Sequence, residues 1–207
     1  MEVLNLYAGI GGNRKLWGDD HNITAVEWDE ETAKVYQDYF PNDKVIVGDA
    51  HQYLLEHYKD YDFIWSSPPC PTHSKLRFMQ KEKMYPDLSL YEEILFLENW
   101  FNGRWIVENV EPYYEPLIAP SKNMHRHLFW SNFKIPFIKM DSLQTCKAEK
   151  EREFLEDKFG YDLSSYTGID KRKALRNCVV PELGLRIFNA AQNIITKSCT
   201  EQGVLFQ

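Results

Sequence analysis

The stretch LNLYAGIGG, residues 4–12, passes from an apolar, strand-like run directly into a glycine-rich turn. Glycine adopts positive φ without steric cost and lets a ligand approach the backbone closely. Such a turn is a weak signal alone, because an ordinary connection uses the same residues. Gly9, Gly11 and Gly12 do not have the GxGxxG spacing of a dinucleotide site. The turn therefore favours a ligand that lacks a pyrophosphate.

Strand-like and helix-like segments alternate along the rest of the chain. Predicted strands cover residues 3–7, 23–26, 45–47, 63–65, 105–107 and 127–130. Predicted helices cover residues 13–17, 30–40, 51–58, 87–101, 148–158 and 181–196, with Asp87 expected as an N-cap. Strands separated by single helices predict an α/β fold with a doubly wound, mostly parallel sheet of Rossmann-like type.

The composition fits one globular domain, because 207 residues with 43% hydrophobic content can build a single core without disulfides or metals. The four cysteines (Cys70, Cys146, Cys178 and Cys199) form no CxxC pair. This spacing disfavours a zinc site and suits a reducing compartment. The sequence shows no signal peptide and no apolar run of membrane-spanning length. These features predict a cytoplasmic protein with no metal and no membrane contact.

The net charge of −7 argues against a nucleic-acid partner, but the basic residues are clustered. They group in residues 75–83, 122–127 and 171–176. The first group follows Cys70 directly, and a local basic rim on an acidic body is compatible with phosphate binding. Charge runs are more often solvated faces, so the pattern supports a nucleic-acid partner only together with other motifs.

Two acidic residues end the second and third predicted strands. Glu27 stands where a carboxylate takes both hydroxyls of a ribose, and Asp49 stands where one accepts an adenine amino group. Three consecutive strand ends that supply glycine, glutamate and aspartate predict an adenosine pocket. Because the turn lacks the pyrophosphate spacing, the predicted cofactor is S-adenosyl-L-methionine rather than NAD.

The segment YDFIWSSPPC, residues 61–70, places one thiol after a rigid double proline at the end of a buried strand. Open α/β folds bind their ligands at this edge of the sheet. Glu108, in Glu108-Asn109-Val110, closes the next strand, and a glutamate beside a thiol is a nucleophile with a proton-handling partner. The simpler alternatives are an inert buried cysteine and a solvated strand-end glutamate.

The motifs occur in the order found in DNA cytosine-5 methyltransferases. They are Tyr7 to Gly12, Glu27, Asp49, Pro68-Pro69-Cys70 with Ser74, Glu108-Asn109-Val110 and Arg176-Asn177-Cys178-Val179. The chain resembles that family from Leu4 to about Ile195. The resemblance implies that Cys70 attacks cytosine C6, that Glu108 contacts N3 and the exocyclic amine, and that C5 takes the methyl group. It also implies double-stranded DNA as the partner, with the target nucleotide extruded into the pocket.

The resemblance implies three sets of site residues in this chain. The catalytic set is Cys70, Glu108 and Arg126. The cofactor-binding set is Tyr7, Ala8, Gly9, Gly11, Gly12, Glu27, Trp28, Asp49, Ala50, Pro68, Asn177 and Val179. The DNA-binding set is Ser74, Lys75, Arg77, Lys171, Arg172 and Arg176.

The chain also departs from the family pattern. Ser67 and Pro71 stand where glycine and glutamine are usual, and Pro71 stiffens the loop that follows the thiol. An arginine-x-arginine motif is replaced by His125-Arg126-His127; we expect Arg126 to carry part of its role, and which of the three faces the pocket stays open. Arg176 replaces a glycine, and a cation there raises the less favoured alternative of carboxymethyl transfer from a carboxylated donor.

Four regions are predicted along the chain. They are a catalytic and cofactor-binding core at 1–133, a reduced target-recognition segment at 134–173, a helix returning to the core at 174–198 and a tail at 199–207. The tail ends in VLFQ, which resembles a cleaved viral 3C-type protease site. The recognition segment is smaller than an independently stable domain. Recognition is therefore expected to be short and lax, or to be completed by a second subunit.

Three functions stay open at this point. The leading one is an active DNA cytosine-5 methyltransferase that uses S-adenosyl-L-methionine; the compact form suggests restriction-modification in a bacterial or phage-infected cell as its setting. The second is a methyltransferase-fold subunit that needs a partner for DNA recognition and activity. The third is an enzyme that modifies cytosine in RNA or in free nucleotides, which also requires attack at C6.

Overall fold

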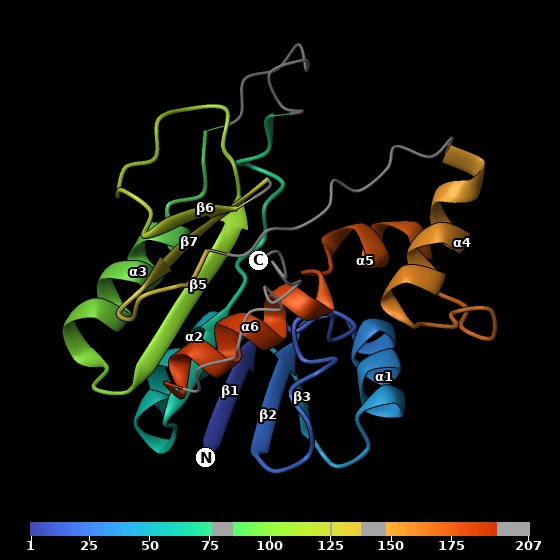
Figure 1. The fold of residues 1–207 in the computed structure, drawn as a ribbon, viewed down its shortest axis with the longest axis horizontal. Coiled ribbons are helices and arrows are strands. Elements are labelled where there is room, and N and C mark those ends of the chain that lie inside the picture. The colour runs from blue at the N-terminus through green and yellow to red at the C-terminus, as the bar shows by residue number, and fades with distance from the viewer. Residues whose placement is uncertain (76–84, 125, 138–147, 194–207) are drawn as a thin grey trace, which may run out of the picture.

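The computed structural model describes residues 1–75, 85–124, 126–137 and 148–193. These residues form a seven-stranded sheet in the order β3-β2-β1-β4-β5-β7-β6 (Figure 1). The strands are β1 (Glu2–Leu6), β2 (Asn22–Glu27), β3 (Lys44–Val47), β4 (Phe63–Ser66), β5 (Arg104–Val110), β6 (Lys122–Met124) and β7 (His127–Ser131). The strands from β3 to β5 are parallel, and β7 is antiparallel to both neighbours. The predicted doubly wound, mostly parallel sheet is confirmed.

Helices cover both faces of the sheet. They are α1 (Glu30–Tyr39), α2 (Ala50–His57), α3 (Ser89–Trp100), α4 (Ala148–Phe159), α5 (Lys171–Asn177) and α6 (Pro181–Ala191), with a 3-10 turn η1 (Tyr58–Asp60). Along β1, Val3 packs in one core with Phe188 of α6, and Leu4 packs in another with Leu54 of α2. Figure 1 shows α6 in front of the sheet and α2 and α3 behind it.

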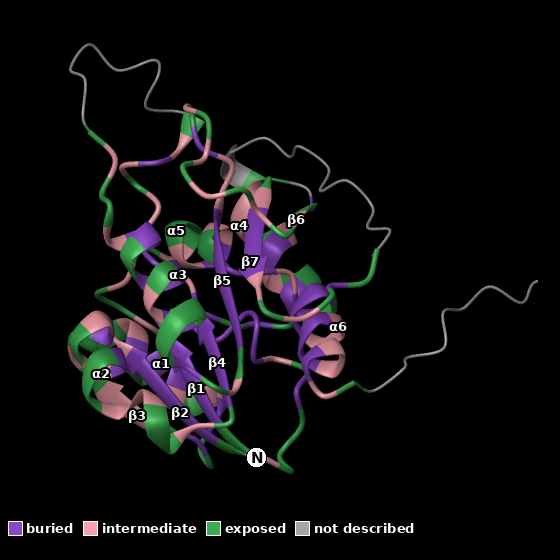
Figure 2. Ribbon diagram, turned by 90° about the vertical axis from the view of Figure 1, so that its left-hand side faces the viewer, coloured by how far each residue is buried: buried purple, intermediate pink, exposed green. Residues whose placement is uncertain are grey.

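The central strands are buried on both faces. β1 is buried from Val3 to Leu6, and β4 is buried along its whole length; Figure 2 shows both strands within the buried centre. Parallel strands covered by helices on both sides read as continuous apolar runs, which explains why residues 63–65 show no alternation. Polar groups that face a ligand are therefore expected at the strand ends and in the loops.

The two motif-bearing loops leave the sheet at one point. From β1 the chain passes to β2, and from β4 it passes to β5 on the opposite side, although β1 and β4 are neighbours. Open α/β sheets bind ligands at such a switch point. The glycine turn follows β1 and the Pro-Pro-Cys loop follows β4, so the fold brings both motifs to the same edge.

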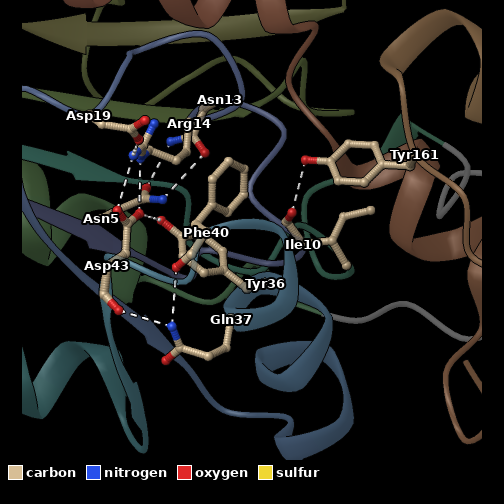
Figure 3. Close-up of polar contacts among 10 residues, drawn as sticks. All are labelled: Asn5, Ile10, Asn13, Arg14, Asp19, Tyr36, Gln37, Phe40, Asp43 and Tyr161. Atoms are coloured by element: carbon tan, nitrogen blue, oxygen red, sulfur yellow. Dashed lines mark hydrogen bonds and ion pairs between the residues drawn. The ribbon is translucent and has the colours of Figure 1, made fainter.

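Residues 13–17 form turns, and the short helix predicted there is wrong. Buried polar contacts fix this stretch instead (Figure 3). Arg14 donates to the two carboxylate oxygens of Asp43 at 2.9 and 3.0 Å, and Asn13 donates to Asn5 of β1 at 2.7 Å. These contacts hold the side chains of Asn13 and Arg14 toward the buried polar groups of other elements, and the backbone follows them in turns rather than in a helix.

Where it is described, the segment predicted for target recognition is part of the core. Leu155, Phe159 and Leu163 are at most 6% exposed and pack with Val35 of α1. Tyr161 donates to the carbonyl of Ile10 at 2.9 Å, and Figure 3 shows it reaching toward the glycine turn. The segment therefore supports the cofactor side of the sheet, whatever else it contacts.

The remaining differences from prediction lie at element ends and edges. The strand predicted at 127–130 is present as β7 but runs antiparallel, and neither β6 nor α5 was predicted. The N-cap of α3 is Leu88; Asp87 lies one residue earlier and accepts from the amide of Ser89 at 3.0 Å. The helix predicted at 181–196 ends at Ala191; Gln192 and Asn193 form a turn, and residues 194–196 lie outside the described part of the chain.

Candidate active site

The loop after β4 holds Cys70 on a rigid backbone. Asn109 of β5 donates from Nδ2 to the carbonyl of Pro68 at 2.9 Å, which ties the loop to the next strand. The carbonyl of Cys70 accepts from the amides of His73 and Ser74 at 3.0 and 3.1 Å, so the chain turns tightly after the thiol. Two prolines and these hydrogen bonds leave the loop little freedom.

Charges of both signs surround the Cys70 thiol, which is partly buried and free of any disulfide. Burial raises the pKa of this thiol and the negative charge of Glu108 raises it further, whereas Arg126 and Lys173 lower it. The net shift is upward, so the sulfur is protonated at neutral pH. The two cations favour the thiolate that a nucleophile requires.

Glu108 is oriented by a neighbour on β7. Its side chain is 8% exposed, and its carboxylate contacts Nδ1 of His127. Arg126 donates from Nε to Nε2 of His127 at 3.3 Å. Because Nε2 accepts this hydrogen bond, the ring proton of neutral His127 lies on Nδ1 and points to Glu108. Arg126 and His127 are the two described residues that stand in place of the arginine-x-arginine motif. Of these two, His127 contacts the Glu108 carboxylate.

Arg126 connects the contact between Glu108 and His127 to α5. It is exposed, and its Nη2 donates to the backbone carbonyl of Arg176. Its charge lowers the pKa of Cys70, while its hydrogen bond orients His127. This geometry makes Arg126 a positioning residue; direct contact with a substrate base stays a prediction. His125 lies outside the described residues.

The glycine turn has one side open to a ligand. Gly9 has φ of +55° and donates its amide to Glu27 Oε2 at 2.8 Å, while the amide of Asp29 lies 3.1 Å from Oε1. A Cβ on Gly9 would meet no atom within 4 Å, whereas one on Gly11 would come within 2.3 Å of the Phe40 ring. Open space is therefore found at Gly9, and Gly11 is required by packing inside the protein rather than by a ligand.

Gly12 is required by the last motif of the chain. A Cβ at Gly12 would lie 2.5 Å from Cβ of Cys178 and 2.9 Å from the carbonyl of Val179. Asn177 is exposed at the end of α5, directly before this contact. The fold thus brings the first and last predicted cofactor motifs together. Cys178 is itself buried, and burial raises its pKa to about 12, which excludes it as a thiolate at neutral pH.

The predicted adenosine residues lie at the carboxyl ends of β2 and β3. Trp28 follows Glu27 and is 74% exposed, so its ring offers an open apolar surface. Asp49 is the N-cap of α2 and accepts from the amide of Gln52 at 3.0 Å, while Ala50 behind it is buried. If Asp49 binds adenine as predicted, its carboxylate would accept hydrogen bonds both from adenine and from the first turn of α2.

The first group of predicted DNA contacts lies directly beyond the thiol loop. Lys75 Nζ is 2.7 Å from a carboxylate oxygen of Glu111. Ser74 forms an isolated bridge with Pro112. Arg77 lies outside the described residues. The basic rim expected here is therefore partly neutralised by an acidic neighbour.

The second group lies on α5 and is also engaged within the protein. Lys171 donates to the carbonyl of Ser164 at 3.0 Å. Arg172 and Arg176 both pair with Glu151 of α4. Contacts between these cations and DNA stay predictions, and they would compete with the ion pairs described here.

Sequence reasoning did not single out three residues that shape the site. The sequence left open which of His125, Arg126 and His127 faces the pocket. Lys173 was noted only as one member of a basic group. Glu93 of α3 is fully buried at the same edge of the sheet, yet no local signal distinguishes it from its exposed neighbour Glu92. Each becomes visible only when separate elements are brought together.

Two further observations are limited to the described ranges. No helix there is both long and apolar enough to cross a membrane. No group of three or more His, Cys, Asp or Glu side chains there has the arrangement of a metal site.

A parallel sheet that carries an open glycine turn on one side of its switch point and a thiol with a carboxylate on the other defines a Rossmann-like enzyme of the group-transfer class. The model of the C-5 cytosine-specific DNA methylase family matches residues 1–111. The chain belongs to this family.

Individual relatives match smaller parts of the chain. The Type II methyltransferase M.Bsp6I of Bacillus sp. (strain RFL6) is 31% identical over 77 residues, which cover 36% of this chain and 24% of that protein. DNMT2 of Spodoptera frugiperda, solved as an E260A/E261A/K263A mutant, is 27% identical with a TM-score of 0.41, over 53% of this chain and 35% of that one. A putative DNA modification methyltransferase of an E. coli prophage is 22% identical with a TM-score of 0.38, over 56% and 33% of the two chains. The chain thus matches about a quarter of its curated relative.

Proposed function

We propose that this chain is a DNA cytosine-5 methyltransferase that uses S-adenosyl-L-methionine. The observation that carries the proposal is the joint position of Cys70, Glu108 and the glycine turn at one switch point. Cys70 follows β4, Glu108 lies on the neighbouring β5, and the charge of Glu108 acts on the thiol. Family membership supports the same reaction.

The residues of the glycine turn fit the proposed cofactor. Gly9 borders open space, Glu27 presents a carboxylate at the end of β2, and Trp28 offers an exposed ring. Glycine-rich turns admit a ligand close to the backbone, and strand-end carboxylates bind ribose hydroxyls. When bound, S-adenosyl-L-methionine supplies the methyl group as an electrophile.

The chemistry of cytosine then falls to Cys70 and Glu108. The sulfur adds to C6 as a thiolate, and the electrons of the C5–C6 double bond become nucleophilic at C5 while Glu108 holds N3. After C5 has taken the methyl group, its proton passes to a base, the sulfur–C6 bond breaks and the double bond is restored. Arg126 and Lys173 assist the first step because they favour the ionised thiol.

The substrate must present C6 outside a base stack. A duplex cytosine is accessible to Cys70 only after extrusion, which costs a few kcal/mol and must be offset by contacts to the opened DNA. The bacterial source of the curated relative supports restriction-modification in a bacterial or phage-infected cell as the setting.

A requirement for a second subunit is the alternative that the surface favours. The described part of the recognition segment packs on α1, and two of its cations, Arg152 and Arg172, are paired with Glu156 and Glu151. Within the described residues, these paired cations would have to leave their partners before they could read base edges in the major groove. A partner that supplies this readout would leave the chemistry on this chain.

Product analysis tests the proposal. Purified protein is incubated with duplex DNA, RNA or free cytidine nucleotides and the isotope-labelled cofactor, and the nucleosides are separated by mass spectrometry. We expect labelled 5-methylcytosine in DNA, and none with Cys70→Ala. N4-methylcytosine, or label confined to RNA or nucleotides, would contradict the proposal; activity that appears only with a co-purified partner would support the alternative.

A further inference from the structure

Glu93 is a buried carboxylate that the proposed chemistry does not use. It lies on α3, its side chain is 0% exposed, and it belongs to the apolar face that covers the sheet. A charged carboxylate in such a place is unfavourable unless hydrogen-bond donors replace its water. Its partners therefore indicate why it is there.

Three donors from three different elements meet at this carboxylate. Tyr7 donates its hydroxyl to Oε1 at 2.5 Å, and Ser66 donates its hydroxyl to Oε2 at 2.6 Å. Nδ1 of His51 lies 3.1 Å from Oε1. A carboxylate that accepts several charge-assisted hydrogen bonds fixes the groups around it.

Each of these partners belongs to the proposed cofactor edge. Tyr7 begins the glycine turn, Ser66 is the last residue of β4, and His51 follows Asp49 and Ala50 at the start of α2. The carboxylate thus connects the loops that leave three parallel strands.

Tyr7 gives this connection a specific purpose. Its φ of +55° is a left-handed conformation that is uncommon for residues other than glycine. Such a conformation persists only where surrounding contacts hold it. The Tyr7 ring packs against the core of the protein, and its hydroxyl is held by Glu93, two residues before Gly9 with its open face.

We propose that Glu93 is a positioning residue of the cofactor site, which holds Tyr7, Ser66 and His51 so that the glycine turn is preformed for S-adenosyl-L-methionine. This inference rests on the proposed function and assigns a role to a residue outside every motif of the family resemblance. The thiol loop has its own anchor in the Asn109 contact with Pro68. Loss of Glu93 is therefore expected to weaken cofactor binding more than the chemical step.

The contact between His51 and Glu93 makes cofactor binding depend on pH. Acidic groups face His51 from α3 (Glu92 at 3.8 Å and Glu93 at 3.1 Å), from the α2 N-cap (Asp49) and from the loop before α3 (Asp87). The hydrogen bond to Glu93 is the largest cause that raises the His51 pKa above its ordinary 6.5. A raised pKa means that protonated His51 stabilises the folded site below about pH 6.5 and that this contribution is lost as pH rises through the folded value. Cofactor affinity should fall over the same interval.

The test compares two glutamates on one helix. Glu93→Gln removes the buried charge, and Glu98→Gln makes the same change at an exposed position of α3. Dissociation constants for S-adenosyl-L-methionine and S-adenosylhomocysteine are measured by calorimetry, and kcat is measured at saturating cofactor. We expect Glu93→Gln to weaken binding about tenfold, or about 1.4 kcal/mol, with kcat within about twofold, and Glu98→Gln to bind like the wild type.

The pH series adds a readout that a merely structural role would not move. Wild-type affinity should decline from mildly acidic to mildly alkaline pH, and His51→Gln should abolish that decline. If Glu93→Gln fails to fold, Tyr7→Phe replaces it, because it removes a single donor; a dissociation constant unchanged from wild type in that variant would overturn the inference.

The outcomes for the two proposals are separable. A wild-type protein that binds cofactor as tightly as Glu93→Gln contradicts the positioning role alone. A wild-type protein that binds neither S-adenosyl-L-methionine nor S-adenosylhomocysteine contradicts the proposed function itself.

Discussion

The Cys70 thiol is held between opposing charges, and this balance can be measured without any substrate. Glu108 raises its pKa, and Arg126 and Lys173 lower it. Only the thiolate reacts with alkylating reagents. The rate of Cys70 alkylation at a fixed pH therefore reports the electrostatic field at the sulfur.

Glu108→Gln should accelerate the alkylation of Cys70 by iodoacetamide. Removal of the nearby negative charge lowers the thiol pKa. The fraction of thiolate at mildly alkaline pH then rises, and we expect alkylation to become about threefold faster. Lys173→Met should have the opposite effect. Modification of Cys70 is followed by peptide mass spectrometry, with Glu111→Gln as the control; equal rates in all variants would show that Glu108 does not act on the thiol.

His127 should matter for turnover rather than for cofactor binding. Its Nδ1 contacts Glu108 and its Nε2 accepts from Arg126, so His127→Ala frees the carboxylate to rotate. We expect single-turnover methyl transfer to slow by about tenfold or more, with the cofactor dissociation constant unchanged. The control is His57→Ala at the end of α2; a loss of cofactor binding in His127→Ala would assign this residue to the other half of the site.

At the scale of elements, the glycine turn depends on the buried ion pair that follows it. Arg14 is 3% exposed and Asp43 is 2% exposed, and Tyr36 of α1 donates to the same carboxylate at 2.8 Å. These contacts, shown in Figure 3, fasten residues 13–17 to α1 and β3. Loss of one partner leaves an uncompensated buried charge.

Arg14→Met should destabilise the fold by about 3 kcal/mol. The matched control is Arg172→Met, which breaks the half-exposed pair with Glu151 and should cost at most about 1 kcal/mol. Urea unfolding, followed by circular dichroism, measures both changes. Equal losses in the two variants would mean that the buried pair does not support the fold.

Elements with strong local sequence patterns could be predicted, whereas elements that form only through contacts with other parts of the chain could not. α1 has a capping aspartate, Asp29, and a clear apolar face, so its range was foreseen to one residue. β6 is three residues long and exists only through pairing with β7. Residues 13–17 were predicted to form a short helix, but they form turns in which the side chain of Arg14 is buried against Asp43. Tertiary contacts decide such segments, and a single sequence does not display them.

The same limit applies to the candidate site. Cys70 and Glu108 were found because rigid, specific motifs surround them. Glu93 was missed because its partners come from β1, β4 and α2. The pairing of Arg172 and Arg176 with Glu151 could not be predicted either, because Glu151 lies on α4 and the two arginines lie on α5.

At the scale of the whole molecule, the proposed DNA substrate is a polyanion, whereas the protein carries a net charge of −7. Binding of DNA releases counterions in proportion to the phosphates contacted, so its salt dependence counts the available cations. The pairing of Arg172 and Arg176 with Glu151 predicts a shallow dependence.

Glu151→Gln should strengthen DNA binding and steepen its salt dependence. The variant frees two arginines on α5, and we expect about threefold tighter binding at low salt. Fluorescence anisotropy with a labelled duplex measures the effect. Glu153→Gln, an exposed change on the same helix, is the control; equal effects would attribute the gain to net charge alone.

The central claim is that Cys70 forms a covalent bond to C6 of cytosine. A duplex that contains 5-fluorocytosine tests it, because fluorine at C5 cannot leave as a proton and the adduct is trapped. We expect a denaturant-stable complex whose mass equals protein plus DNA plus one methyl group, formed only with S-adenosyl-L-methionine. The complex should persist in Cys146→Ala and be absent in Cys70→Ala; an adduct that survives in Cys70→Ala, or methylated product from that variant, would contradict the account.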